Sequence, residues 1–318
     1  MNVTGHFWTI FPTVRHTLAP TNAPAALPWS TELSDPERGT ITLGGDLRPV
    51  PGARACLVLV HGLGGTTGSF YNVAAAQAAE AAGVSCLRIS LRGADRRGED
   101  FYHGGLVEDL QAALASEALA HYEDLFIMGF SLGGHMTLRF ALAPSDPRVR
   151  AVAAICPPLD LAKCADAIDR PRAFVYRRAV LNGLKEIYEA VAQRKSVPTP
   201  LQRVRAIQYL REWDRLTVAP RYGFASEDDY YRRMSVGPRL RELAVPTLVV
   251  HSRRDPMIPP ATYAHLQTGS SPNLTWLHVD DGGHVAFPER VNLHLNGTGD
   301  GVSVEAQALH FLLRSTNS

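Results

Sequence analysis

The chain has 318 residues, of which 45% are hydrophobic and 20% are charged. These proportions are typical of a globular protein with a sizeable core, built as one large domain or two ordinary ones. The formal net charge is +1, so no general basic field favours nucleic acid as a partner.

The cysteines and the hydropathy of the chain indicate where in the cell the protein is expected. The four cysteines show neither a CxxC pair nor a zinc-ligand spacing, so we expect reduced thiols and a cytoplasmic location. The first residues lack the basic start of a signal peptide. No stretch approaches the roughly 18 apolar residues of a membrane-spanning helix. We therefore expect no transmembrane segment, and peripheral contact with a membrane stays open.

The first half of the chain predicts an α/β protein. Residues 1–50 are rich in Pro, Thr and Gly and predict an extended N-terminal arm with short strands, such as one at 40–43. From residue 51, apolar runs alternate with helical patterns. Strands and helices are predicted in turn at 56–62, 70–83, 84–90, 106–122, 124–130, 131–143 and 149–155. This alternation predicts a mostly parallel sheet with helices on both faces.

The alternation stops at Pro157 and resumes after residue 238. Residues 157–238 are helical in pattern and carry 15 Lys/Arg against 10 Asp/Glu, so we interpret them as an insertion. After them we predict a strand at 246–252, a helix following Pro260, a strand at 273–279 and a helix at 304–313. The predicted core is then residues 51–156 and 239–318.

A G-x-S-x-G motif at residues 129–133 stands between a predicted strand and a predicted helix. Side chains at 129 or 133 would collide with the tight turn, so glycine is needed at both positions. The turn holds Ser131 above the sheet at a helix N-terminus. There the backbone N–H of Leu132 is free to donate to an oxyanion. The motif predicts a nucleophilic serine.

A serine hydroxyl needs a base, and the base needs an orienting acid, in the chain order Ser, acid, His. Asp255 follows the strand at 246–252, and His284 follows the last predicted strand. Both stand at carboxyl ends of strands, where open α/β sheets keep their sites. We favour Asp255 and His284 as acid and base. The competitors are His278, which lies inside a predicted strand, and Asp280 or Asp281, which we interpret as turn formers.

The loop after the first apolar strand reads H-G-L-G-G at residues 61–65. Its glycines allow main chain to approach a bound carbonyl, and the N–H of Leu63 is the candidate second oxyanion donor. The loop lacks the lysine of a phosphate-binding loop and the G-x-G-x-x-G of a dinucleotide site. Histidines and carboxylates elsewhere do not fall at metal-ligand spacing. We predict neither metal nor cofactor.

Other residues allow two readings. Tyr102 and His103 follow a predicted strand and either line the mouth of the site or pack as turn residues. His135, on the helix behind Ser131, is expected to pack or to face solvent. Asp214 and Arg215 are candidates for an internal salt bridge.

The sequence resembles the α/β-hydrolase superfamily and, within it, the YheT-like branch, which is related to the eukaryotic ABHD acylglycerol lipases and to alcohol acyltransferases. The matching stretches are GHFWTI near the start, HGLGG, LRG (91–93), FYHGGLVEDL (101–110), GFSLGG, REWDRLTVAPRYGF (211–224), DDYYRRMS (228–235), PTLVVHSRRDPMIP and GGHVAFP. The resemblance implies an α/β-hydrolase fold, a helical cap built from residues 157–238, and a Ser131, Asp255 and His284 triad.

The expected activity is hydrolysis of a small carboxylic ester or acylglycerol with short or medium acyl chains. Two alternatives stay open. Transfer of the acyl group to an alcohol would use the same residues, and a non-catalytic binding protein could keep the same fold. Nothing in the sequence indicates the oligomeric state.

Overall fold

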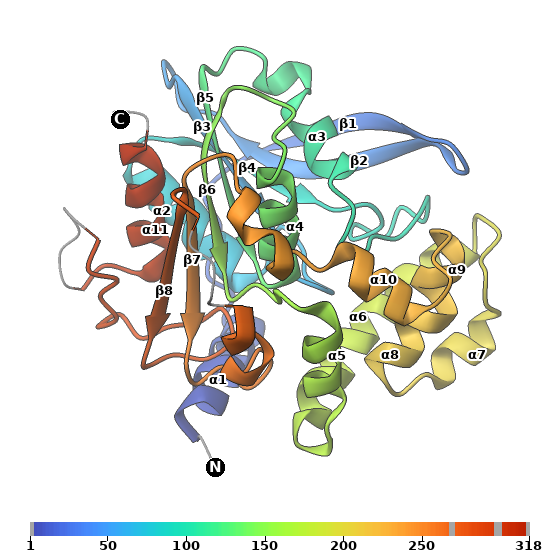
Figure 1. Ribbon diagram of the computed structural model, residues 1–318. Coiled ribbons are helices and arrows are strands. Elements are labelled where there is room, and N and C mark those ends of the chain that lie inside the picture. Colours follow the sequence, from blue (N-terminus) through green and yellow to red (C-terminus); the bar gives the residue numbers. More distant parts are fainter. Residues whose placement is uncertain (1–2, 267–270, 296–300, 316–318) are drawn as a thin grey trace.

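The computed structural model describes residues 3–266, 271–295 and 301–315, and a single eight-stranded sheet forms its centre (Figure 1). The strand order is β1-β2-β4-β3-β5-β6-β7-β8. The pairs β1–β2 and β2–β4 are antiparallel and all the others are parallel. The strands are β1 Leu27–Asp35, β2 Gly39–Arg48, β3 Ala55–Val60, β4 Ser85–Ser90, β5 Asp124–Phe130, β6 Val149–Ile155, β7 Thr247–Ser252 and β8 Leu274–Val279.

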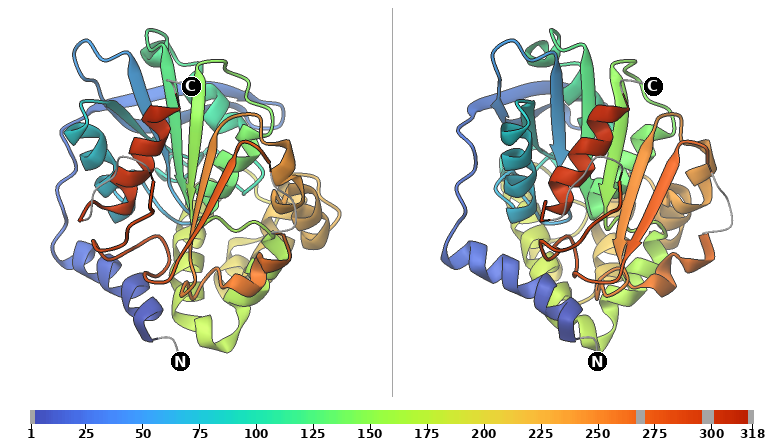
Figure 2. Two further views of the ribbon diagram at one scale, coloured as in Figure 1. Left: turned by 60° about the vertical axis from the view of Figure 1, so that its left-hand side comes forward. Right: turned by 90° about the vertical axis from the view of Figure 1, so that its left-hand side faces the viewer.

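Helices cover both faces of the sheet, which confirms the predicted fold class. Helices α2 (Phe70–Ala81) and α11 (Val304–Arg314) pack on one face (Figure 2). Helices α3 (Glu108–Leu114) and α4 (Leu132–Ala141) pack on the other. The strands between these layers are buried on both faces, because crossover helices leave no side of a parallel sheet to solvent.

Residues 157–238, which we call the helical segment, lie beyond the carboxyl ends of the parallel strands (Figure 1). The segment contains helices α5 Leu161–Asp169, α6 Phe174–Ala192, α7 Leu201–Ala206, α8 Leu210–Trp213, α9 Ala219–Arg221 and α10 Glu227–Met234, with a π-helical turn at Asp214–Val218.

A buried ion-pair network joins the helical segment to the rest of the molecule. The Arg221 guanidinium of α9 contacts the fully buried Asp100 carboxylate at 2.8 Å and Asp35 of β1 at 3.2 Å. Arg92 contacts the same two carboxylates, at 3.3 and 3.1 Å, and also Asp109 of α3 at 2.7 Å. Charges buried this deeply are tolerated only when they are paired. The network therefore holds the helical segment in a defined position against the sheet.

Three elements differ from prediction. Residues 3–18, predicted as extended, form helix α1 (Val3–Leu18), which lies at the carboxyl end of the sheet (Figure 2). Tertiary packing of Gly5 and Thr9 overrides the low helix propensity of a segment that contains Pro12. Where a helix is predicted after Pro260, the described residues up to 266 form two short 3-10 turns. The predicted helix 106–122 is α-helical from Glu108 to Leu114 and is followed by a 3-10 turn.

No helix among the described residues is both long and apolar enough to cross a bilayer.

Candidate active site

Ser131 occupies a strained turn between β5 and α4. Its φ and ψ are 52° and −122°, a conformation that L residues adopt only where the surroundings enforce it. A Cβ at Gly129 would lie 2.3 Å from the Gly133 carbonyl oxygen, and a Cβ at Gly133 would lie 2.3 Å from that of Val60. Both glycines are therefore needed, as the motif predicted.

The structure brings the three predicted side chains together in one hydrogen-bonded chain. The Nε2 atom of His284 lies 2.9 Å from the Ser131 Oγ atom. The Nδ1 atom of the same ring lies 2.8 Å from Asp255 Oδ2. In the neutral ring, Nδ1–H donates to the carboxylate and Nε2 is left to accept a proton from the serine. This arrangement can activate a hydroxyl as a nucleophile.

Asp255 follows β7 and is held as an ionised acceptor. Its Oδ1 atom accepts hydrogen bonds from the backbone N–H groups of Met257 and Ile258, at 2.8 and 2.9 Å. Burial opposes the charge, but attraction to His284 and these hydrogen bonds outweigh it, so the pKa of the Asp255 carboxyl is lowered. The carboxylate stays charged at neutral pH and fixes the orientation of the His284 ring.

Helix α1 positions the loop after β8 that carries His284, which we call the histidine loop. The sequence did not predict this contact. The backbone N–H of His284 donates to Thr9 Oγ1 at 2.8 Å, and the Thr9 hydroxyl donates to the Gly5 carbonyl at 2.8 Å. Gly283 packs against the same turn, since a Cβ there would lie 2.5 Å from the Gly5 oxygen. The contact joins residues 275 positions apart, and no local pattern indicates it.

The H-G-L-G-G loop is braced against the site by two tyrosines. The Tyr71 hydroxyl accepts from the Gly62 N–H at 3.0 Å. The Tyr102 hydroxyl accepts from the Gly64 N–H at 2.7 Å and donates to the Gly62 carbonyl at 3.3 Å. Leu63 lies between these fixed points. A loop held on both sides of Leu63 is suited to present its N–H in a constant direction.

A cavity of about 360 Å³ opens onto Ser131 and His284. Leu63 and Leu132 line it, and so do Tyr102 and His103. The last two are buried rather than at a mouth. His103 packs against the rings of Tyr222, Phe224 and Tyr230, and burial lowers the pKa of its imidazole. The remaining wall is mostly apolar and includes side chains of α1, α2, α5, α6, α8 and α10, of the π-helical turn, and of the turn after Asp255.

The competing residues lie elsewhere. His278 is on β8, with its ring stacked on that of Tyr263. Asp280 pairs with Arg253 at 3.0 Å, and Asp281 pairs with Arg290. His135 is fully buried behind the serine, with its ring against the Pro158 carbonyl. None of these side chains replaces His284 or Asp255.

The salt bridge expected between Asp214 and Arg215 is wrong. Asp214 is buried in the cavity wall, where it accepts a hydrogen bond from the Tyr231 hydroxyl at 2.6 Å. Burial raises the pKa of its carboxyl to about 7. Arg215 is exposed and lies 3.9 Å from Glu227. Neighbours in a helix-like turn point to different sides, so adjacency in sequence did not bring the two charges together.

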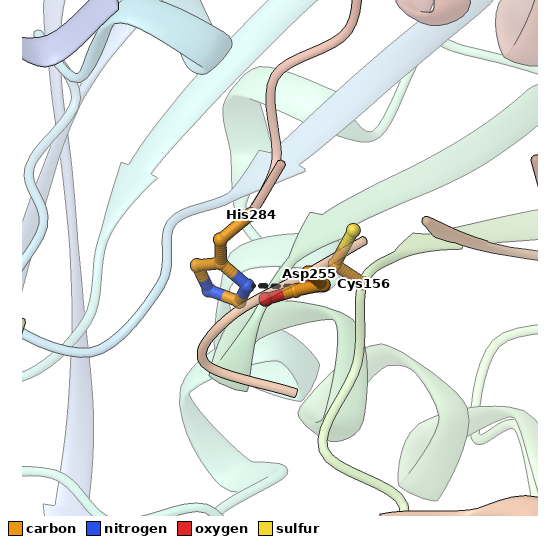
Figure 3. Close-up of side chains that lie close together, drawn as sticks. All are labelled: Cys156, Asp255 and His284. Carbon is orange, nitrogen blue, oxygen red and sulfur yellow. Dashed lines mark hydrogen bonds and ion pairs between the residues drawn. The ribbon is translucent and has the colours of Figure 1, made fainter. Parts of the chain in front are cut away.

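Cys156 lies beside Asp255 on the side away from His284 (Figure 3), and one ligand atom from each of the three lies within 4.8 Å of the others. A metal site would need a thiolate and free carboxylate oxygens. Burial raises the pKa of the Cys156 thiol well above its ordinary value, and both Asp255 oxygens already accept N–H groups. The cluster fits an oriented acid–base pair better than a metal centre.

Known proteins share this architecture. Residues 56–291 match the family described as alpha/beta hydrolase fold. The putative esterase YheT of Escherichia coli is 30% identical over 250 residues, which cover 75% of this chain and 72% of that protein. Human phospholipase ABHD3 is 23% identical over 248 residues, which cover 75% of this chain and 60% of that protein.

One solved structure extends the likeness of fold. The alpha/beta hydrolase GrgF from Penicillium sp. sh18 superposes with a TM-score of 0.54 over 92% of this chain and 100% of that one, at 18% identity. At this identity the likeness concerns the fold alone.

Proposed function

Because this chain belongs to the α/β-hydrolase fold family, in its YheT-like branch of esterase- and lipase-type hydrolases, we propose that it cleaves carboxylic esters through an acyl intermediate on Ser131. The observation that carries the proposal is the hydrogen-bonded chain from Asp255 through His284 to Ser131 at the wall of an apolar cavity.

In the acylation step, His284 Nε2 takes the proton of Ser131 as the Oγ atom attacks the ester carbonyl carbon. The resulting imidazolium is stabilised by the ionised Asp255 carboxylate. When the tetrahedral intermediate collapses, the bond to the alcohol oxygen breaks and His284 protonates that oxygen. The alcohol leaves, and the acyl group stays on the serine.

The developing oxyanion is held by backbone donors. We assign this role to the N–H groups of Leu63 and Leu132, which flank Ser131 in the cavity wall. Leu132 is the first residue of α4, where a helix has no internal acceptor for its N–H. Removing one oxyanion donor typically costs about 10²–10³ in turnover.

Deacylation repeats the sequence with water. His284 takes a proton from a water molecule, the hydroxide oxygen attacks the acyl carbon, and the bond to Ser131 Oγ breaks as the serine regains its proton. The products are a carboxylic acid and an alcohol. No redox step or metal is required by this chemistry.

The shape and lining of the cavity support a proposal for the substrate class. Its wall is mostly apolar and includes side chains of α1, α5 and α6. Its volume of about 360 Å³ lies at the small end of ligand pockets. We propose that it receives a short or medium acyl chain, and that the helical segment (residues 157–238) acts as the cap over it.

The test is hydrolysis of p-nitrophenyl esters from acetyl to palmitoyl by the wild type and by Ser131→Ala. We expect wild-type turnover with an optimum at short or medium chains, and a loss of at least about 10⁴-fold in kcat for the variant. Ser34→Ala, an exposed serine of β1, is the matched control and should keep full activity. A fluorophosphonate probe should label the wild type and Ser34→Ala but not Ser131→Ala.

Two results would redirect the proposal. If the wild type neither turns over any ester nor reacts with the probe, the fold serves a non-catalytic binding function. If added ethanol or glycerol captures most of the acyl group as a new ester, acyl transfer rather than hydrolysis is the reaction, since an alcohol then replaces water at the acyl-enzyme.

A further inference from the structure

Helix α1 presents an apolar face to solvent. Phe7, Ile10, Phe11, Val14 and Leu18 recur every three or four residues along it, and each is between 40% and 81% exposed. This spacing puts them on one side of a helix. Surface helices of globular proteins normally turn such a face inwards, so an exposed apolar face of this size indicates an interaction surface.

The exposed face continues onto the start of α6. Phe174 and Val175 are 53% and 59% exposed. The two helices are in contact there, because the His6 ring lies 2.5 Å from the hydroxyl of Tyr176 and stacks on its ring. We call the seven exposed side chains of α1 and α6 the apolar rim: Phe7, Ile10, Phe11, Val14, Leu18, Phe174 and Val175.

The apolar rim is also the entrance to the cavity. Ile10, Val14 and Val175 are exposed and at the same time line the cavity that contains Ser131. α1 and α5–α6 lie next to each other beyond the carboxyl ends of the strands (Figure 2). The rim and the cavity therefore share apolar side chains from both helices.

The two segments that carry the rim contain basic charges only, whereas Glu289 and Arg290 line a neighbouring hollow beside Phe11. Residues 3–18 and 170–178 contain no Asp or Glu. Arg15 in the last turn of α1, and Arg170, Arg172 and Arg178 around Phe174, are exposed. Apolar side chains flanked by arginines match the boundary of an anionic lipid layer, which attracts basic side chains near its surface.

We propose that the apolar rim docks on the surface of an anionic lipid layer and takes ester substrates from it into the cavity. The second half of this statement rests on the proposed esterase function, whereas docking itself does not. The inner face of α1 holds His284 through Thr9. The helix that meets the lipid is therefore the helix that positions the histidine loop.

The experiment is flotation of the full chain with vesicles of phosphatidylcholine alone, or mixed with phosphatidylglycerol. We expect the wild type to float with the mixed vesicles, and the ratio of bound to free protein to fall at least about ten-fold in Phe7→Ser/Leu18→Ser. Arg172→Gln/Arg178→Gln should bind the mixed vesicles more weakly than the wild type does. The difference should shrink as salt is added, because salt screens the attraction. Leu27→Ser replaces an apolar residue 61% exposed at the start of β1 and should bind like the wild type.

Docking, measured by flotation, and catalysis, measured by ester hydrolysis, are tested with separate variants. Ser131→Ala should float like the wild type, and Phe7→Ser/Leu18→Ser should hydrolyse a water-soluble ester like the wild type. The proposal is overturned if the wild type binds neither kind of vesicle. It is also overturned if Phe7→Ser/Leu18→Ser and Leu27→Ser bind the mixed vesicles equally well. It is also overturned if light scattering shows a dimer that Phe7→Ser/Leu18→Ser dissociates, because a second copy of the chain would then cover the rim.

Discussion

At the scale of single residues, the site depends on backbone positions that tolerate no side chain. Ser131 adopts a positive φ only because the chain on either side packs tightly around it. Gly133 is the most constrained neighbour, since a Cβ there would meet two carbonyl oxygens, of Val60 at 2.3 Å and of His61 at 2.4 Å. Both belong to backbone and cannot swing away as a side chain can.

We therefore predict that Gly133→Ala lowers the free energy of unfolding by at least about 1–3 kcal/mol, the usual cost of overpacking, and reduces turnover by moving Ser131. Gly68→Ala is the control, because its nearest neighbour would lie 3.7 Å away and Gly68 has no positive φ. Urea denaturation of both variants measures the difference. Equal stabilities would contradict the account of the turn.

At the scale of elements, α1 acts as a support for the histidine loop. Thr9→Val keeps the shape of the side chain but removes the acceptor of the His284 N–H. A buried N–H without a partner costs about 1–3 kcal/mol, so the loop should shift and kcat should fall about ten-fold or more, with KM changed less.

The control for this prediction lies two turns along the same helix. Thr17 makes the equivalent bond to a helix carbonyl, at 2.9 Å from Thr13 O, but is exposed. Thr17→Val should leave kcat unchanged. If Thr9→Ser keeps the wild-type kcat and Thr9→Val lowers it, the Thr9 hydroxyl acts by positioning His284 rather than by stabilising the fold in general.

Local signals predicted most of these elements and long-range contacts decided the rest. The alternation of apolar runs and helical patterns predicted the strands from β3 to β8, and the glycine pattern around Ser131 predicted the turn, because both follow from short-range sterics. The role of Thr9 was not predictable, since it depends on a contact with His284 across 275 positions. For Tyr102 the sequence left two readings, a residue at the mouth of the site or a packed turn residue. Its hydroxyl braces the H-G-L-G-G loop, a role that no local pattern indicates.

At the scale of the whole molecule, buried histidines couple stability to pH. His251 is fully buried, and its Nε2 faces the Pro157 carbonyl at 2.9 Å while its Nδ1 accepts from the Trp276 indole N–H at 3.0 Å. His61 is similar, with Nδ1 at the Gly62 carbonyl and Nε2 accepting from the Leu91 N–H. Each ring uses one nitrogen as donor and the other as acceptor, so a second proton would face an N–H group.

Burial accordingly lowers the pKa of both imidazoles from 6.5 to about 4. Between these values the unfolded chain binds more protons than the folded one, so stability falls as pH falls from about 6.5 to 4 and is level above that range. Each ring contributes a slope of up to about 1.4 kcal/mol per pH unit. Urea denaturation from pH 4.5 to 7.5 should show this slope, and His251→Gln should reduce it by about one proton. The exposed His121→Gln is the matched control for removal of an imidazole. An unchanged slope in His251→Gln would show that the buried ring accepts its proton without cost.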